Sequence, residues 1–164
     1  MKNNLHATSK GFTLVELMVA ISIIGILSSI VYANFGEARK ASRDDVRKTS
    51  LKEMQLAIEF YKAQNDEYPA AGCGAGTGNF AEADATCTEY VTGLIPDFIP
   101  ALPMDPSREN EPGVGFMYRS DGQNYKLMIK DAAEVKTVVA GDEFANDDGD
   151  PDTYAVYSAG AINW

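Results

Sequence analysis

Residues 11–16 read Gly-Phe-Thr-Leu-Val-Glu, and they join a short polar leader to a long apolar run. Across residues 12–35 the only charged side chain is Glu16. An ionised group inside an apolar helix of bilayer length is costly, so it usually has a functional partner. Cleavage after Gly11 would supply one, because the new α-amine of Phe12 would lie one helical turn from the Glu16 carboxylate.

Two commoner explanations of the apolar run leave part of this pattern unexplained. A secretory signal has an apolar stretch of about 7–15 residues with its small-residue cleavage site beyond it. Here the run is longer, and Gly11 precedes it. A plain membrane anchor fits the length, since about 20 apolar residues span a bilayer, but it gives no reason for Glu16. The combination therefore predicts a membrane helix that is processed at its start.

The arrangement closely resembles the type IV prepilin signal, which type IV pilins share with type II secretion pseudopilins. The resemblance implies that prepilin peptidase cuts between Gly11 and Phe12 and that the amine of Phe12 is then N-methylated. It also implies that Glu16 pairs with the first residue of a neighbouring subunit during assembly. Such a pairing is physically reasonable, because either charge left alone in a low-dielectric helical bundle is expensive.

The chain divides into three predicted parts: residues 1–11 are a cleaved leader, residues 12–35 a transmembrane and filament-core helix, and residues 36–164 a globular head. The head includes the amphipathic second half of the helix, which we expect to end near Gln64. The expected fold class is α+β and pilin-like, with the long helix packed on a small antiparallel sheet. Basic residues in the leader place it in the cytoplasm and the head outside.

Helical spacing beyond the anchor predicts which residues of the long helix face the domain. The expected apolar stripe comprises Val46, Leu51, Met54, Ala57, Ile58, Phe60 and Tyr61. The residues expected on a solvated or partner-facing side are Arg47, Lys48, Lys52 and Glu53. We expect the helix to end before Tyr68, which precedes a proline and is therefore disfavoured in the helical region.

The second half of the chain carries the strand signals. Residues 114–119 and 123–130 are expected to form a hairpin around Asp121-Gly122, which would supply the positive dihedral angles of a tight turn. Within this hairpin Tyr125, Leu127 and Ile129 should face the core, and Lys126, Met128 and Lys130 should face away. Further strand candidates are residues 135–140 and 153–158. Residues 86–99 are expected to be short helix or irregular.

Charge and cysteine content limit the possible functions. The chain has 24 acidic and 14 basic residues, a formal net charge of −10, so we expect no nucleic acid to bind the head. In an oxidising compartment Cys73 and Cys87 are expected to form a disulfide. A Cys-Cys metal site is the alternative, but the only histidine, His6, lies in the leader. With no histidine in the head, the sequence predicts no enzyme.

One acidic stretch is a candidate calcium site. Asp147, Asp148, Asp150 and Asp152 surround a glycine and offer the oxygen ligands that calcium prefers. The spacing does not match an EF-hand loop, and a flexible hydrated loop is the alternative. The resemblance adds that this stretch lies near the calcium-binding region of major pseudopilins. The Leu-Pro-Met-Asp-Pro sequence at residues 102–106 is also similar to a turn of those proteins.

These observations predict a structural filament subunit that associates with copies of itself. The resemblance names its other partners as prepilin peptidase, an inner-membrane assembly platform and, before assembly, membrane lipid. The chain would first be a single-pass inner-membrane protein and later part of a cell-surface pilus or a periplasmic pseudopilus. The alternative is a monomeric membrane-anchored binding domain, with calcium as its candidate ligand, which would have no need of Glu16.

Overall fold

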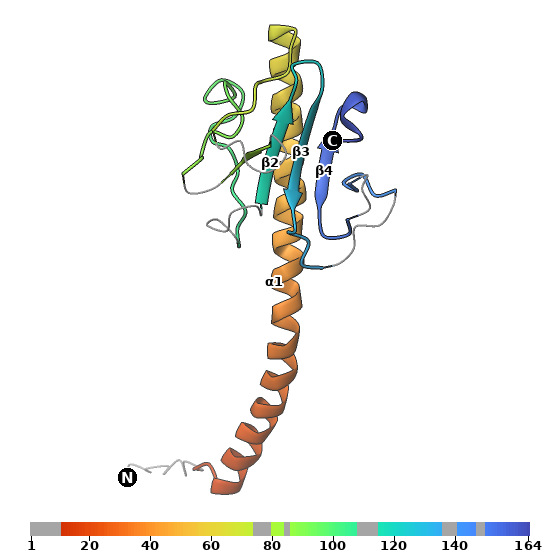
Figure 1. The fold of residues 1–164 in the computed structure, drawn as a ribbon. Helices are drawn as coiled ribbons and strands as arrows, with labels where there is room; N and C mark the ends of the chain where they lie inside the picture. The colour runs from red at the N-terminus through yellow and green to blue at the C-terminus, as the bar shows by residue number, and fades with distance from the viewer. Residues whose placement is uncertain (1–10, 74–79, 84–85, 108–114, 136–140, 147–149) are drawn as a thin grey trace, which may run out of the picture. The chain divides into compact units, whose positions relative to one another are not determined.

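The computed structural model describes residues 11–73, 80–83, 86–107, 115–135, 141–146 and 150–164. Its elements are α1 (Leu14–Asn65), β1 (Ala81–Glu82), β2 (Gly115–Ser120), β3 (Tyr125–Lys130), β4 (Tyr154–Tyr157) and the 3-10 helix η2 (Ala159–Ala161) (Figure 1). The chain separates into two compact units, Met1–Ala38 and Arg39–Trp164. One long helix with a small antiparallel sheet confirms the predicted α+β pilin-like fold.

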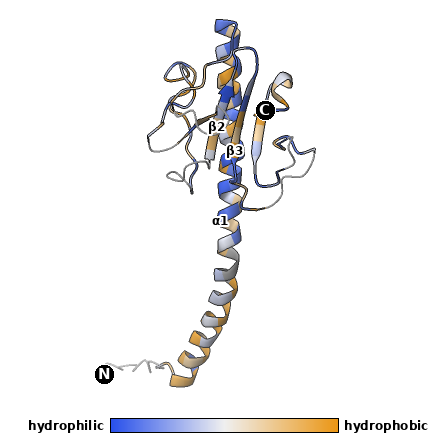
Figure 2. Cartoon of the chain, in the orientation of Figure 1, coloured by the Kyte–Doolittle hydropathy of each residue, from blue (hydrophilic) through white to orange (hydrophobic). Residues whose placement is uncertain are grey.

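The first unit contains the apolar part of α1. By length and composition this helix is able to cross a membrane, and Figure 2 shows the hydrophobic character of its first turns. In this unit each large apolar side chain whose burial is described is more than half exposed within the chain, from Val19 at 53% to Phe12 at 88%. The helix begins at Leu14, two residues later than the sequence suggests.

In the second unit, the strands form one antiparallel sheet in the order β1-β2-β3-β4. The predicted hairpin is present as β2 and β3, with Ser120 opposite Tyr125. Within the turn that joins these strands, only Gly122 has a positive φ, at 84°. Asp121 stabilises the turn differently, because its carboxylate accepts hydrogen bonds from the N–H groups of Gln123 and Asn124. The turn therefore needs one left-handed residue rather than two.

The core lies between the second half of α1 and one face of the sheet. From α1, Leu51, Met54 and Ile58 are fully buried, and they belong to the same cluster as Leu127 and Ile129 of β3. Full burial of a side chain of this size contributes about 1.5–3 kcal/mol. The predicted stripe is too wide, however. Val46 and Phe60 are 51% and 63% exposed, because they lie toward the side of α1 that the sheet does not cover.

The end of α1 differs in its cause from the prediction. Asp66 adopts a left-handed conformation with φ of 62°, and its N–H donates to the carbonyl of Lys62. A single left-handed residue after the last helical residue is a common way to end a helix. The Lys62 ammonium donates in turn to the Asp66 carbonyl. The last helical residue, Asn65, therefore lies three residues before Tyr68.

One strand prediction needs correction, and the predicted strand at residues 135–140 stays a prediction. Lys126 of β3 is buried although the alternation places it on the outer face. Its ammonium donates to the backbone carbonyl of Trp164 and lies over the Tyr157 ring. The buried charge therefore has partners in the C-terminal residues. Residues 153–158 contain β4, but Val135 lies in a bend and residues 136–140 are outside the described residues. Strand β1 and its pairing with β2 were not predicted.

The most consequential correction concerns Arg47, which is fully buried rather than solvated. Asp105 accepts two hydrogen bonds from its guanidinium, at 2.7 and 3.0 Å. The same guanidinium donates to Asp44 at 2.6 Å, to Glu134 at 2.9 Å and to the Ser107 hydroxyl at 2.7 Å. Arg47 therefore joins α1 to the 102–106 turn and to the chain after β3.

Asp44 gives this cluster a second connection to the same chain segment. Its carboxylate accepts hydrogen bonds from the backbone N–H groups of Glu134 and Val135. Arg43 adds two further hydrogen bonds to the Glu134 carboxylate. Burial lowers the pKa of Arg47, but the hydrogen bonds to Asp105 and Glu134 outweigh it and raise the pKa above its usual value. The guanidinium is thus permanently charged and fully bonded.

We predict that Arg47→Met destabilises the head by about 3–5 kcal/mol, because it leaves the carboxylates of Asp44 and Asp105 buried without their cation. The measurement is urea unfolding of the full-length chain in detergent micelles. Lys52→Met is the matched control, since Lys52 pairs with Glu143 at the exposed surface and should cost about 1 kcal/mol or less. Equal losses for the two variants would contradict the account.

We also predict that the head loses stability in acid through Glu134. Hydrogen bonds from Arg43, and then from Arg47, lower the pKa of Glu134 from 4.5 to about 2. A carboxyl group whose pKa is lower in the folded state stabilises the fold fully above its unfolded pKa. That contribution is lost as the pH falls from 4.5 toward 2. Glu134→Gln should make the unfolding free energy less dependent on pH in this window, and an unchanged slope would argue against it.

Candidate functional site: the start of the apolar helix

The first turn of α1 brings Thr13 and Glu16 together. The Glu16 Oε2 atom accepts hydrogen bonds from the Thr13 N–H at 2.9 Å and from the Thr13 hydroxyl at 2.7 Å. In return the Thr13 hydroxyl accepts a bond from the Glu16 N–H at 3.2 Å. This reciprocal pattern is a capping box, which satisfies backbone N–H groups that a helix start leaves unpaired. The Thr-x-x-Glu spacing of residues 13–16 is a signal in the sequence by which this capping box could be predicted.

The capping box sets the position of the Glu16 carboxylate relative to the predicted cleavage point. Gly11 and Phe12 are described but precede the first helical residue. Both Thr13 bonds go to one carboxylate oxygen, Oε2, and a carboxylate can accept on both oxygens. The arrangement is therefore chemically able to hold the helix start and to receive an ammonium group at the same time.

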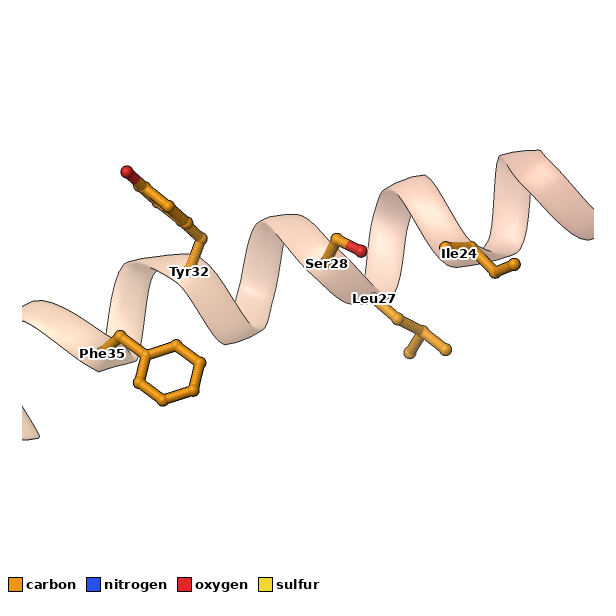
Figure 3. Close-up of a pocket in the computed structure, with 5 residues that line it drawn as sticks. All are labelled: Ile24, Leu27, Ser28, Tyr32 and Phe35. Atoms are coloured by element: carbon orange, nitrogen blue, oxygen red, sulfur yellow. The ribbon is translucent and has the colours of Figure 1, made fainter.

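Further along the helix, one face is hollowed between its side chains. The hollow has a volume of about 290 Å³ and is lined by Ile24, Leu27, Ser28, Tyr32 and Phe35 (Figure 3). These residues recur at helical spacing, and Figure 3 shows Tyr32 and Phe35 projecting from the helix with the short Ser28 side chain between Tyr32 and Ile24. A small side chain among large ones makes room for a side chain of a neighbouring helix.

Two serines in the apolar part of this helix satisfy their hydroxyl groups locally. The Ser22 hydroxyl donates to the Met18 carbonyl, and the Ser29 hydroxyl donates to the Ile26 carbonyl. Hydroxyl groups bonded in this way are tolerated in a bilayer, where an unbonded polar group would cost several kcal/mol. Apart from Glu16, no acidic or basic side chain occurs in residues 12–35. The first half of α1 is thus chemically suited to lipid or to other apolar helices.

In the head, the structure contains the disulfide between Cys73 and Cys87. Cys87 is buried, and the nearby backbone is fixed because the Gly72 N–H donates to the Tyr90 carbonyl. The bridge encloses 13 residues and, on a chain-entropy estimate, constrains the unfolded state by about 2–4 kcal/mol. Its place between the end of α1 and β2 makes it a structural feature of the head.

The acidic stretch is only partly described. Asp147 and Asp148 lie outside the described residues. Asp150 accepts hydrogen bonds from the Asp152 N–H and the Thr153 hydroxyl, a local turn that leads into β4. Within the described residues no three His, Cys, Asp or Glu side chains converge as metal ligands would. Calcium binding by these aspartates stays a prediction.

Comparison with known proteins agrees with this site and fold. Residues 7–32 match the family profile of the prokaryotic N-terminal methylation motif. The chain is 35% identical to the type II secretion system core protein G of Klebsiella pneumoniae over 122 residues, which is 73% of this chain and 81% of the relative. The corresponding protein of Pectobacterium carotovorum subsp. carotovorum is 38% identical over 121 residues, 73% of this chain and 72% of the relative.

A second group of relatives matches over a shorter range. The type IV major pilin protein PilA of Myxococcus xanthus is 38% identical over 66 residues, which is 40% of this chain and 30% of the pilin. No solved structure matches the chain significantly. The motif at the helix start and the long matches through the head show that the chain belongs to the family of type II secretion system core protein G, within the type IV pilin-like superfamily of filament subunits.

Proposed function

We propose that the chain is a subunit of a type II secretion pseudopilus, processed by prepilin peptidase between Gly11 and Phe12. Two observations favour a pseudopilus over a surface pilus. The similarity to core protein G covers 72–81% of those relatives, whereas the similarity to PilA covers 30% of the pilin. In addition, the pseudopilin-like turn at residues 102–106 supplies Asp105, which binds the buried Arg47.

The observation that carries the filament role is the uncovered apolar surface of α1. From Phe12 to Phe35 each large apolar side chain whose burial is described is more than half exposed in the single chain. Burial of apolar surface contributes about 25 cal/mol per Å², so such a helix needs lipid or other helices around it. Before assembly lipid covers it, and in the filament the helices of neighbouring copies replace the lipid.

Within this proposal Glu16 has two tasks. In its own chain it completes the capping box with Thr13. In the filament its carboxylate pairs with the methylated amine of Phe12 in a neighbouring copy, which fixes the axial register between the two subunits. The pairing also explains why a carboxylate is tolerated in the membrane-spanning segment, since an unpaired charge there is costly.

The remaining parts of the chain follow from this role. Residues 1–11 are the leader that the peptidase removes, and residues 36–164 form the head outside the cytoplasm. The inner-membrane assembly platform is the partner with which the membrane-inserted subunits would assemble. The Cys73–Cys87 disulfide fits a head that folds in an oxidising compartment.

We predict that Glu16→Gln is inserted and processed normally but does not assemble. Glutamine also serves in a capping box, so the variant keeps the local helix start while it removes the charge. The measurements are the processed mass in membranes and cross-linking between subunits in native cells. Glu16→Val, which removes the cap as well, should fail in the same way.

Wild-type levels of cross-linked filament from the Glu16→Gln variant would show that Glu16 serves only as a cap. The same strain separates the two filament types. If the chain belongs to a pseudopilus, the variant loses protein secretion and keeps surface motility. Loss of surface pili with normal export would instead assign the chain to a pilus.

A further inference from the structure

A cavity of about 410 Å³ lies in the head beside the end of α1. It is formed where four chain segments meet: the last turns of α1, the stretch after it, the Thr92–Gly93 turn and the tip of the β2–β3 hairpin. Its volume is in the range of small-ligand sites. Neither the processing site nor the assembly surface of α1 includes it, so it needs an explanation of its own.

Two tyrosine rings form its apolar walls, and other residues hold both rings in place. The Tyr61 ring packs against Phe98, with ring centroids 5.5 Å apart. It also lies so close to Gly93 that an added Cβ atom would be 3.2 Å from its Cε2 atom. The Tyr68 ring packs against Tyr125 at 4.7 Å. The walls are therefore rigid before any ligand arrives, which lowers the entropic cost of binding.

Backbone hydrogen bonds fix the segments that carry these side chains. The Tyr68 N–H donates to the Gly122 carbonyl at 2.8 Å, which ties the stretch after α1 to the hairpin tip. Both the N–H and the hydroxyl of Thr92 donate to the Ala70 carbonyl, at 3.0 and 2.9 Å. The cavity is thus a constructed feature of the fold and not a space between loose loops.

The charged groups that line the cavity are both acidic. Glu67 lies over the hairpin tip, with its Oε2 atom 3.7 Å from where a Cβ atom of Gly122 would be. The Asp121 carboxylate is oriented by the hydrogen bonds that it accepts from the N–H groups of Asn124 and Gln123, and these bonds lower its pKa. It therefore stays ionised at neutral pH. Among the described residues that line the cavity there is no lysine or arginine.

The chain already shows which kind of ion the aromatic wall attracts. The Lys62 ammonium lies 5.1 Å from the centre of the Tyr68 ring, as expected for a cation over the negative face of an aromatic ring. Lys62 also donates to the Asp66 carbonyl and so is held at the helix end. The wider head adds to the attraction, because from Met54 onward it has nineteen acidic and six basic residues.

We propose that this cavity binds the ammonium or guanidinium group of a lysine or arginine side chain that a protein partner presents. The two tyrosine rings would enclose the aliphatic stem, and Glu67 and Asp121 would pair with the cationic end. An anionic ligand would be repelled by both carboxylates. A neutral ligand would gain no charge pairing with the two carboxylates that line the cavity.

The test uses the full-length chain in detergent micelles with ring-labelled tyrosine, followed by NMR. The probe is Nα-acetyl-lysine amide, and its neutral counterpart is Nα-acetyl-norleucine amide. We expect saturable shifts of the Tyr61 and Tyr68 ring signals with the lysine amide and none that saturate with the norleucine amide. Glu67→Gln and Asp121→Asn should each weaken binding about two- to fivefold, as expected for a solvent-exposed charge pair.

The matched control is Glu89→Gln, which removes an exposed carboxylate that does not line the cavity. It should leave the lysine titration unchanged. Equal weakening by Glu89→Gln would show that only the general acidity of the head attracts the probe, and the cavity assignment would fail. Saturable shifts of equal size with the norleucine amide, or none with the lysine amide, would also overturn the proposal.

Discussion

One continuous helix has to suit two different surroundings, and the rest of the chain is arranged around that constraint. The first half of α1 is apolar and uncovered within the chain, so it requires lipid or other helices. The second half contributes Leu51, Met54 and Ile58 to the hydrophobic core of the head.

Arg47 is the buried polar contact between α1 and the rest of the head. A buried guanidinium is costly unless every hydrogen-bonding group around it is satisfied, and here Asp44, Asp105 and Glu134 provide those partners. Through Asp105 and Glu134, Arg47 connects α1 with the turn at residues 102–106 and with the chain that follows β3.

The sequence was sufficient for the elements that depend on local patterns. The alternation of Tyr125, Leu127 and Ile129 predicted the core face of β3. It was insufficient where a charge finds partners far along the chain. Arg47 binds residues 58 and 87 positions away, so helical periodicity alone suggested a solvated side chain. The cavity beside the end of α1 joins four separate segments, and no local pattern could indicate it.

We propose that processing between Gly11 and Phe12 is the step by which the chain becomes a filament subunit. The most direct test is the intact mass of the protein in the membrane fraction of native cells and in material sheared from their surface. Our account predicts a mass that begins at methylated Phe12 in the membrane fraction and little protein in the sheared one. A processed chain abundant in the sheared fraction would contradict the pseudopilus assignment. An unprocessed chain in both fractions would contradict processing at Gly11–Phe12 and leave only a plain membrane anchor.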